Sequence, residues 1–496
     1  MKYLISIAIS FFCIFQMNAQ TISDAYLLSN QKISGTARAG ALGNAVGAIG
    51  GDFTSFSINP AGIGLYRTSE FVITPVIRSN SSDLTLGNLT YNDNKFQVKL
   101  SNIGFTGVIP TSNSNSGIVS FNYGIGYNNV LDYSQNFYVN NNNSSASFLD
   151  NIASYANAER LSNSYLNQKI DQIEYRDWPT KLAWDTYLIN PNLDSEGKEI
   201  DGSYSSLLYA DEKVNQRKSF SRSGGINEFV FSGGLNINHK LYLGATLGFQ
   251  NVDLRQVSEY SEIFGDNSYT FGEDYKLTGT GYNLKLGTIF KPQNNIRLGL
   301  AIHTPTYFVL KEEKQLYMDS RLIKNYSSDG INIYEYNLYS PWKTVFSGAY
   351  VFGKKGLISF DAEYLDYSKM KYRKNSSYNE DLSDVNTEIT NGFNNTLNVR
   401  VGMEYKVAPQ ISIRGGYQSY PNAQKEPSGD YYYPLTKKNN SVYSAGLGYN
   451  SSGFFADITY SNSVEKYSLN EIQPNLQSMI LKNSNSSIIF TIGYKF

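Results

Sequence analysis

Residues 397–406, LNVRVGMEYK, alternate strictly between apolar and polar side chains. The odd-numbered positions are all apolar: Leu397, Val399, Val401, Met403 and Tyr405. The even-numbered positions are Asn398, Arg400, Gly402, Glu404 and Lys406. Because successive side chains of a β-strand point to opposite faces, this pattern predicts a strand with one apolar face. Similar alternation recurs at 296–302, 357–364, 442–449 and 486–496. A soluble β-sandwich alternates in the same way, so the pattern alone does not identify the medium that the apolar face meets.

The connections between these segments favour a membrane barrel. From Glu70 onward we expect about fourteen strands, and their joins alternate between short and long. The short joins are near 111–117 and at 238–240, 291–295, 352–356, 407–410 and 450–453, and the long joins are at about 130–222, 311–335, 372–392, 418–440 and 463–485. Barrels of the bacterial outer membrane have short periplasmic turns and longer outer loops. We therefore predict an all-β, transmembrane barrel of about 14 antiparallel strands over 69–496, with both chain ends on the periplasmic side.

A barrel in lipid fixes which face of each strand points outward. The apolar faces should meet lipid, and the polar faces should line the lumen, where charges find water or partners. The expected lumenal charges are Asp361, Glu363, Arg400, Glu404, Lys406 and Arg414. They either line a polar path or pair with one another. Tyrosines at the strand ends are expected to form an interfacial girdle: Tyr364, Tyr417, Tyr420, Tyr443 and Tyr460.

The composition excludes several classes of function. Basic and acidic residues number 42 and 43, so the chain lacks the basic footprint of a nucleic-acid partner. Residues 1–20 have Lys2 before an apolar run and end near a small residue, Ala19, which predicts a secretory signal peptide. The single cysteine, Cys13, lies inside this signal, so the exported chain is expected to have no disulfide and no thiolate site. With only two histidines, we expect no enzyme activity, no metal site and no cofactor.

The longest join, 130–222, is expected to be an extracellular loop with its own structure. Residues 147–168 and 178–190 have helix-like apolar spacing, and Pro179 lies near the start of the second segment. We expect two short amphipathic helices above the membrane. They either cap the mouth of the barrel or form a hydrophobic landing groove for a ligand.

Residues 21–68 precede the first strand, and their stretch 34–67 is rich in glycine. A barrel of about fourteen strands is too wide for its own side chains to fill. Glycine permits tight turns and close backbone approach. We therefore expect this segment to enter the lumen as an N-terminal hatch that plugs the barrel.

Within the hatch, Asn59-Pro60-Ala61-Gly62 is expected to hold one sharp bend. Pro60 fixes its own φ and restricts Asn59, whose side chain can bond nearby backbone groups. Our candidate gating residues are these four together with Asp52 and Phe53.

The stretch from Ala37 to Ile63, with its Asn59-Pro60-Ala61 tripeptide and following Gly62, resembles the hatch of the FadL/TodX family of outer-membrane transporters. The resemblance implies passive uptake of hydrophobic compounds such as long-chain fatty acids, which enter from outside and leave sideways into the bilayer. It also implies a monomer whose partners are a hydrophobic small-molecule ligand and outer-membrane lipid. Two alternatives remain at this stage. One is a barrel scaffold that binds exported proteins for a secretion system, and the weaker one is a general porin.

Overall fold

The computed structural model describes residues 21–86, 89–111, 117–209, 212–375, 381–425, 435–437, 440–469 and 479–496. The expected signal peptide, 1–20, lies outside the described residues. Among the described residues, no helix combines the length and apolar character that a membrane crossing needs.

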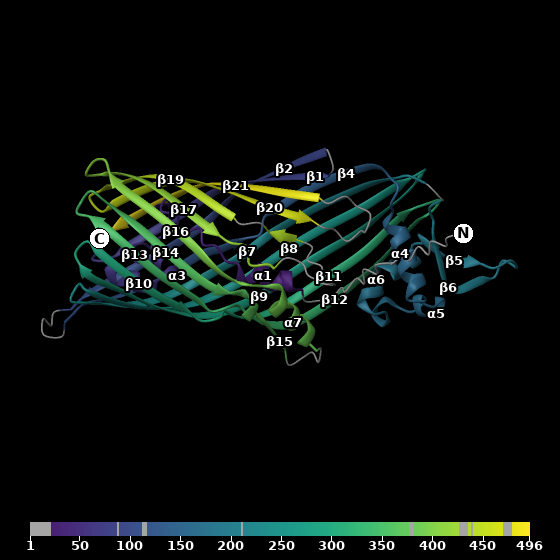
Figure 1. The fold of residues 1–496 in the computed structure, drawn as a ribbon, viewed down its shortest axis with the longest axis horizontal. Coiled ribbons are helices and arrows are strands. Elements are labelled where there is room, and N and C mark those ends of the chain that lie inside the picture. The colour runs from purple at the N-terminus through teal and green to yellow at the C-terminus, as the bar shows by residue number, and fades with distance from the viewer. Residues whose placement is uncertain are drawn as a thin grey trace, which may run out of the picture.

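Long antiparallel strands dominate the chain (Figure 1). The strands are β1 (Glu70–Leu86), β2 (Leu89–Pro110), β3 (Ile118–Asp132), β4 (Gln135–Ser144), β5 (Ile189–Leu193), β6 (Glu199–Ser206), β7 (Val214–Ile237), β8 (Leu241–Phe264), β9 (Asn267–Gln293), β10 (Ile296–His303), β11 (Tyr307–Arg321), β12 (Asn325–Tyr339), β13 (Lys343–Phe352), β14 (Gly356–Asp366), β15 (Lys371–Lys374), β16 (Asn395–Lys406), β17 (Ile411–Tyr420), β18 (Leu435–Lys437), β19 (Asn440–Ser451), β20 (Phe454–Leu469) and β21 (Met479–Lys495).

The helices are short. The α-helices are α1 (Ile22–Ser29), α2 (Ala37–Ala41), α3 (Ser55–Ile58), α4 (Phe148–Ala158), α5 (Asn163–Leu166), α6 (Trp178–Asp185) and α7 (Ser383–Gly392). The 3₁₀ helices are η1 (Pro60–Leu65), η2 (Ile170–Gln172), η3 (Tyr175–Asp177) and η4 (Tyr367–Lys369).

The sheet closes on itself. β1 pairs with β2 along one edge and with β21 along the other, from Glu70↔Lys495 to Leu86↔Met479. Five barrel strands each consist of two consecutive elements: β3 with β4, β10 with β11, β12 with β13, β14 with β15, and β18 with β19. Counted this way, the described residues form a closed barrel of 14 antiparallel strands, as predicted.

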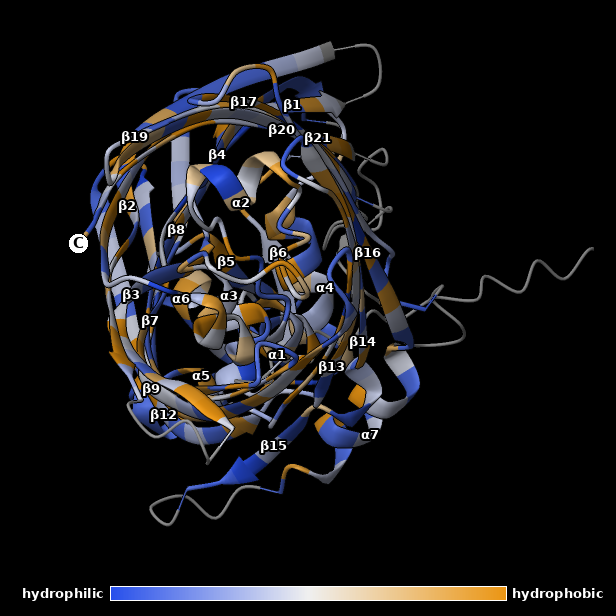
Figure 2. Cartoon of the chain, turned by 90° about the vertical axis from the view of Figure 1, so that its left-hand side faces the viewer, coloured by the Kyte–Doolittle hydropathy of each residue, from blue (hydrophilic) through white to orange (hydrophobic). Residues whose placement is uncertain are grey.

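The two ends of the barrel differ. The C-terminus and the short turns lie at one end, which we call the short-turn end, and α4–α6 lie beyond the other, which we call the long-loop end (Figure 1). Viewed from the short-turn end, the strands form a ring with α2 and α3 inside it (Figure 2).

The predicted faces of the strands are confirmed. Leu397, Met403 and Tyr405 are about half exposed on the outside of the barrel. Four of the lumenal charges pair with one another rather than forming an open polar path, and Asp361 is buried and accepts from the Gly47 amide of the hatch at 3.0 Å. Arg400 contacts Glu363 at 2.6 Å, and Arg414 contacts Glu404 at 2.7 Å. Lys406 instead lies exposed at the end of β16.

Tyr420 does not belong to the expected tyrosine girdle. Its side chain is buried, its hydroxyl bonds the Gln418 side chain, and the Lys32 ammonium lies 4.9 Å from its ring centroid. Tyr420 is the last residue of β17. Its side chain lies on the same lumenal face of β17 as that of Gln418. The position of Tyr420 at a strand end did not indicate which face it would take.

Several expected loops are strands. Residues 311–335 belong almost entirely to β11 and β12, which form one hairpin, and β20 and β21 extend into 463–485. The expected loop 130–222 is shorter, because β3 and β4 reach Ser144 and β7 begins at Val214. A tilted strand needs about 9 to 11 residues to cross a bilayer. β9 has 27, so most of its length lies outside the membrane, where no lipid imposes an apolar face.

The segment between β4 and β7 packs as a cap at the long-loop end. α4 and α6 occur where helices were expected, and the hairpin β5–β6 was not foreseen. Phe148, Leu182 and Tyr204 share a buried cluster with Tyr269 and Leu316 of the barrel strands. The cap is therefore fastened to the projecting wall by apolar contacts.

The face assignment makes a testable prediction about Val401 and Arg400. Val401→Arg places a charge on the lipid face, at a cost of about 2 to 4 kcal/mol near the midplane. We expect a reduced fraction of protein that migrates faster unheated than boiled in SDS gels. Arg400→Val should assemble better, because Lys343 remains 3.4 Å from the Glu363 carboxylate. The opposite order of the two variants would show that the faces are inverted.

Candidate functional site

The glycine-rich segment lies inside the lumen as a hatch, and nearly every residue from Gly35 to Gly64 is buried. Its first part, with α2, packs against β17, β19, β20 and β21. Its last part, η1, packs against β3, β7, β8 and β9. The hatch therefore touches both sides of the ring and occupies the lumen near the short-turn end (Figure 2).

Wall glycines make this close packing possible. A Cβ atom on Gly244 would lie closer than 3.0 Å to the Pro60 carbonyl, and one on Gly287 would clash with the Asn59 side-chain oxygen. On the other side of the lumen, Gly402 and Gly416 meet the backbone of Leu42 and Gly43 equally closely. These glycines lie on the lumenal parity of their strands, where sequence reasoning looked only for charges. Glycine on a lumenal face was the signal that could have located the hatch contact.

Asn59 holds the expected bend. Its side-chain amide donates to the Gly47 carbonyl at 2.7 Å and to the Thr288 carbonyl of β9 at 3.1 Å. Its side-chain oxygen accepts from the Ala61 amide at 3.2 Å, and Pro60 begins η1. One side chain thus ties two parts of the hatch to each other and to the wall.

The other candidate residues also lie within the hatch core. Asp52 accepts from the Thr36 hydroxyl at 2.8 Å and from the Thr54 amide at 2.9 Å, which closes the hatch loop on itself. Phe53 is fully buried, and its ring lies against Gly104 and Gly126 of the wall. The Gly51 amide donates to the Gly62 carbonyl at 3.0 Å.

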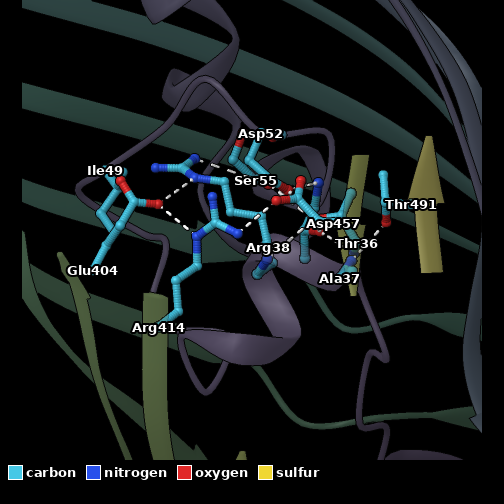
Figure 3. Close-up of polar contacts among 12 residues, drawn as sticks. Thr36, Ala37, Arg38, Ile49, Asp52, Ser55, Glu404, Arg414, Asp457 and Thr491 are labelled. Atoms are coloured by element: carbon cyan, nitrogen blue, oxygen red, sulfur yellow. Dashed lines mark hydrogen bonds and ion pairs between the residues drawn. The ribbon is translucent and has the colours of Figure 1, made fainter. Parts of the chain in front are cut away.

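Sequence reasoning missed the ion-pair network that joins hatch and wall (Figure 3). Arg38 of α2 contacts Glu404 of β16 at 3.0 Å and lies 4.0 Å from Asp52. Arg414 of β17 contacts the same Glu404 at 2.7 Å and Asp457 of β20 at 2.5 Å. The charge of Arg38 was visible in the sequence, but its partner lies 366 positions away, and no local pattern reports such a pair.

A second element, α1, lies above the hatch in the lumen. Thr21 and Asp24 form a capping box at its start, which is the sequence signal for this helix. Ile22, Ala25 and Leu28 pack against barrel residues such as Tyr275 and Leu338. From α1 the described chain runs on through the lumen to the hatch.

Beside α1 lies a cavity of about 630 Å³, which we call the upper cavity. Its apolar wall contains Tyr26, Leu27, Tyr133, Phe137, Phe148, Phe220, Tyr260 and Phe271. Phe137 and Phe220 stack with centroids 4.7 Å apart, and the Arg222 guanidinium lies 5.1 Å from the Phe220 ring. Lys32, Lys218 and Arg222 also line it. Most of its surface is apolar, although polar residues outnumber apolar ones in its lining. A cavity of this size with a largely apolar surface is typical of a small-molecule site.

A closed barrel with a lumenal hatch and an apolar cavity above it defines an outer-membrane transport protein rather than an open pore. A family model described as outer membrane protein transport protein (OMPP1/FadL/TodX) matches residues 225–496. The chain belongs to this family, and its location is the bacterial outer membrane.

Two solved structures are similar to the chain. The toluene transporter TodX of Pseudomonas putida is 11% identical, with 94% of this chain and 98% of that chain covered and a TM-score of 0.50. A FadL homologue of Pseudomonas aeruginosa is 11% identical, with the same coverage and a TM-score of 0.53. No curated protein matches the sequence. At this identity the likeness supports the fold alone.

The close contacts between wall glycines and the hatch predict which substitution lets ions leak through the barrel. Gly287→Val should push Asn59 away from the wall and raise ion leak through the barrel in planar bilayers. Gly233→Val is the matched control, because nothing lies within 4 Å of a Cβ atom at that position. Equal conductance of both variants and the parent, with normal assembly, would contradict the assigned packing.

Proposed function

We propose that the protein mediates passive uptake of small hydrophobic compounds, with long-chain fatty acids as the preferred class. The upper cavity carries the proposal. It lies on the long-loop side of the hatch, which corresponds to the outside in barrels with short periplasmic turns. Action as a monomer and export by residues 1–20 form part of the same proposal.

Cations positioned beside the aromatic wall of the upper cavity support a fatty acid over an uncharged hydrocarbon, although the carboxylates Asp24, Asp132, Glu273 and Glu465 line the cavity as well. Lys218 and Arg222 line the same space as Phe137 and Phe220. Arg222 already donates to the Gln256 side chain at 2.6 Å, so its guanidinium is held in place. A carboxylate can accept from such positioned cations while its alkyl chain contacts the aromatic wall.

A break in the wall supports a sideways exit. β2 pairs with β3 from Asn102↔Asn128 to Pro110↔Ser120, whereas the remainder of β2, 89–101, has no ladder on that side in the described part of the chain. Side-chain contacts bridge the gap: Lys99 contacts Asp132 at 2.9 Å, Ser134 donates to Gln97 at 2.9 Å, and Lys95 donates to Asn136 at 3.2 Å. Asp132 and Ser134 also line the upper cavity. The cavity therefore reaches the gap.

The surface beside the gap is apolar. Phe96 and Val98 of β2 are 69% and 67% exposed on the outer face, so this part of β2 suits contact with lipid. A hydrophobic solute that left the cavity here would pass into the bilayer without meeting the hatch.

Cross-linking the gap tests the exit. In Gln97→Cys/Ser134→Cys, joined by a short bifunctional thiol reagent, we expect uptake of a fluorescent fatty acid to fall at least fivefold. The exported chain has no other cysteine, because Cys13 lies in the signal. The control is Ile109→Cys/Phe121→Cys, a pair already in register between β2 and β3. An exit elsewhere would leave both cross-linked variants as active as the parent.

We propose that the hatch acts as a gate and that Asn59 and Pro60 set the balance between its resting and displaced states. A ligand can displace it only if it binds the displaced state better than the resting state. Asn59→Ala/Pro60→Ala removes the bonds to Gly47 and Thr288 and loosens the bend. We expect normal heat-dependent mobility, altered uptake of a hydrophobic tracer and raised ion leak. A double variant with parental uptake and parental conductance would make the hatch a passive filler.

Native mass spectrometry of the detergent-solubilised parent tests the substrate class. Bound fatty acid is the expected result. Co-purified protein partners without lipid would favour the scaffold interpretation instead, and steady conductance of the parent would favour a porin.

A further inference from the structure

A second cavity, of about 550 Å³, lies on the short-turn side of the hatch, and we call it the lower cavity. Four carboxylates line it, and each has a cation partner. Asp52 and Glu404 have Arg38, Asp457 has Arg414, and Glu70 lies 3.6 Å from Lys495. The acidic side chains of this cavity are therefore already neutralised.

Four further cations line the same cavity without a carboxylate partner among the described residues: Arg67, Lys291, Arg297 and Lys406. The charged groups near Lys291 are Arg297 and Arg67, both cations. The charged side chains near Arg297 are Arg38 and Arg67, with the Tyr242 phenol beside them. This arrangement places like charges together in a partly enclosed space, which costs free energy unless an anion joins them.

Arg297 has unused hydrogen-bonding capacity. One terminal nitrogen of its guanidinium donates to the Ile49 carbonyl of the hatch. Its Nε is buried and has no acceptor in the described part of the chain. A guanidinium presents its donors as a fork that matches the oxygens of phosphate groups, and a lysine adds a point charge.

The surface around the cavity has the same sign. The exposed charged residues on the short turns and beside β1 are basic throughout the described residues: Arg67, Lys240, Lys354, Lys355 and Lys406. The acidic residues near this end, such as Glu70, Glu404 and Asp457, are buried in the lumen. The resulting positive potential attracts anions toward the mouth.

We propose that Arg67, Lys291 and Arg297 form a binding site for a phosphate group at the short-turn mouth of the barrel. The group belongs to a phospholipid headgroup or to a soluble phosphate, which offer the same chemistry. Because Arg297 also holds the Ile49 carbonyl, the bound anion contacts the residue that anchors the hatch. The site is separate from the upper cavity and does not depend on which hydrophobe is carried.

Binding to the full chain in a nonionic detergent tests the site. The probes are inorganic phosphate and a short-chain phosphatidylglycerol, with the matching phosphatidylcholine for comparison, and the measurement is isothermal titration calorimetry. We expect the parent to bind at least one anionic probe and Lys291→Gln/Arg297→Gln to bind it at least tenfold more weakly. Lys291→Gln alone keeps the Arg297 bond to Ile49, so its loss of affinity reports the site without disturbing the hatch.

The matched control is Lys354→Gln/Lys355→Gln, which removes the same charge from an exposed turn outside the cavity. We expect its affinity to stay within twofold of the parent. Phosphatidylglycerol binding without phosphate binding identifies a headgroup, and phosphate binding that displaces phosphatidylglycerol identifies a site for the group itself. The proposal is overturned if the parent binds neither anion, if the control loses as much affinity as the cavity variant, or if the cavity variant matches the parent.

Discussion

The β1–β21 ladder is the contact on which the rest of the structure depends. Lipid offers no hydrogen bonds, so a sheet that crosses it must leave no open edge. Closing the ring from Glu70↔Lys495 to Leu86↔Met479 satisfies this requirement with fourteen strands. A ring of that size cannot be filled by its own side chains. The lumenal hatch is therefore a consequence of closure, and the wall glycines are a consequence of the hatch, since its backbone lies directly against the strands.

The side gap is a departure from this closure. Where β3 and β4 depart from β2, residues 89–101 have no ladder on that side in the described part of the chain, and side chains join the two edges instead. Polar side chains occupy this position: Lys99 reaches Asp132, Gln97 meets Ser134, and the Asn80 amide donates to the Ser134 carbonyl at 2.8 Å. Side-chain bridges can separate at lower cost than a continuous backbone ladder, because fewer bonds break together. In the proposed route, the gap is the part of the wall that opens.

Sequence alone predicted the features that lipid or the width of the barrel imposes. Alternation identified the strands at 397–406 and 486–496, and the glycine-rich stretch was correctly placed in the lumen. Strand segments outside the membrane need no apolar face, so they lack the alternation that identifies a strand. For this reason 311–335 was expected to be a loop, although it forms a long hairpin. The β5–β6 hairpin was missed because Pro191 and polar residues obscure its alternation. The Arg38–Glu404 pair and the cations around Arg297 come together only through closure of the ring, which no local pattern reports.

The two cavities differ in chemistry, and this difference bears on the route. Apolar groups form most of the surface of the upper cavity, although four cations and four carboxylates also line it, whereas polar groups form most of the surface of the lower cavity. The lower cavity is lined by seven cations and four carboxylates: Arg38, Arg67, Lys291, Arg297, Lys406, Arg414 and Lys495 with Asp52, Glu70, Glu404 and Asp457. An alkyl chain that moved downward would displace water from these charges, and ions lose much free energy when they are desolvated without new partners. In the proposed route the side gap opens beside the exposed apolar side chains Phe96 and Val98, and an alkyl chain gains free energy by leaving water there. The charged lower cavity is thus a barrier to the same solute that the upper cavity suits, and displacement of the hatch alone would not make the axial route favourable for it.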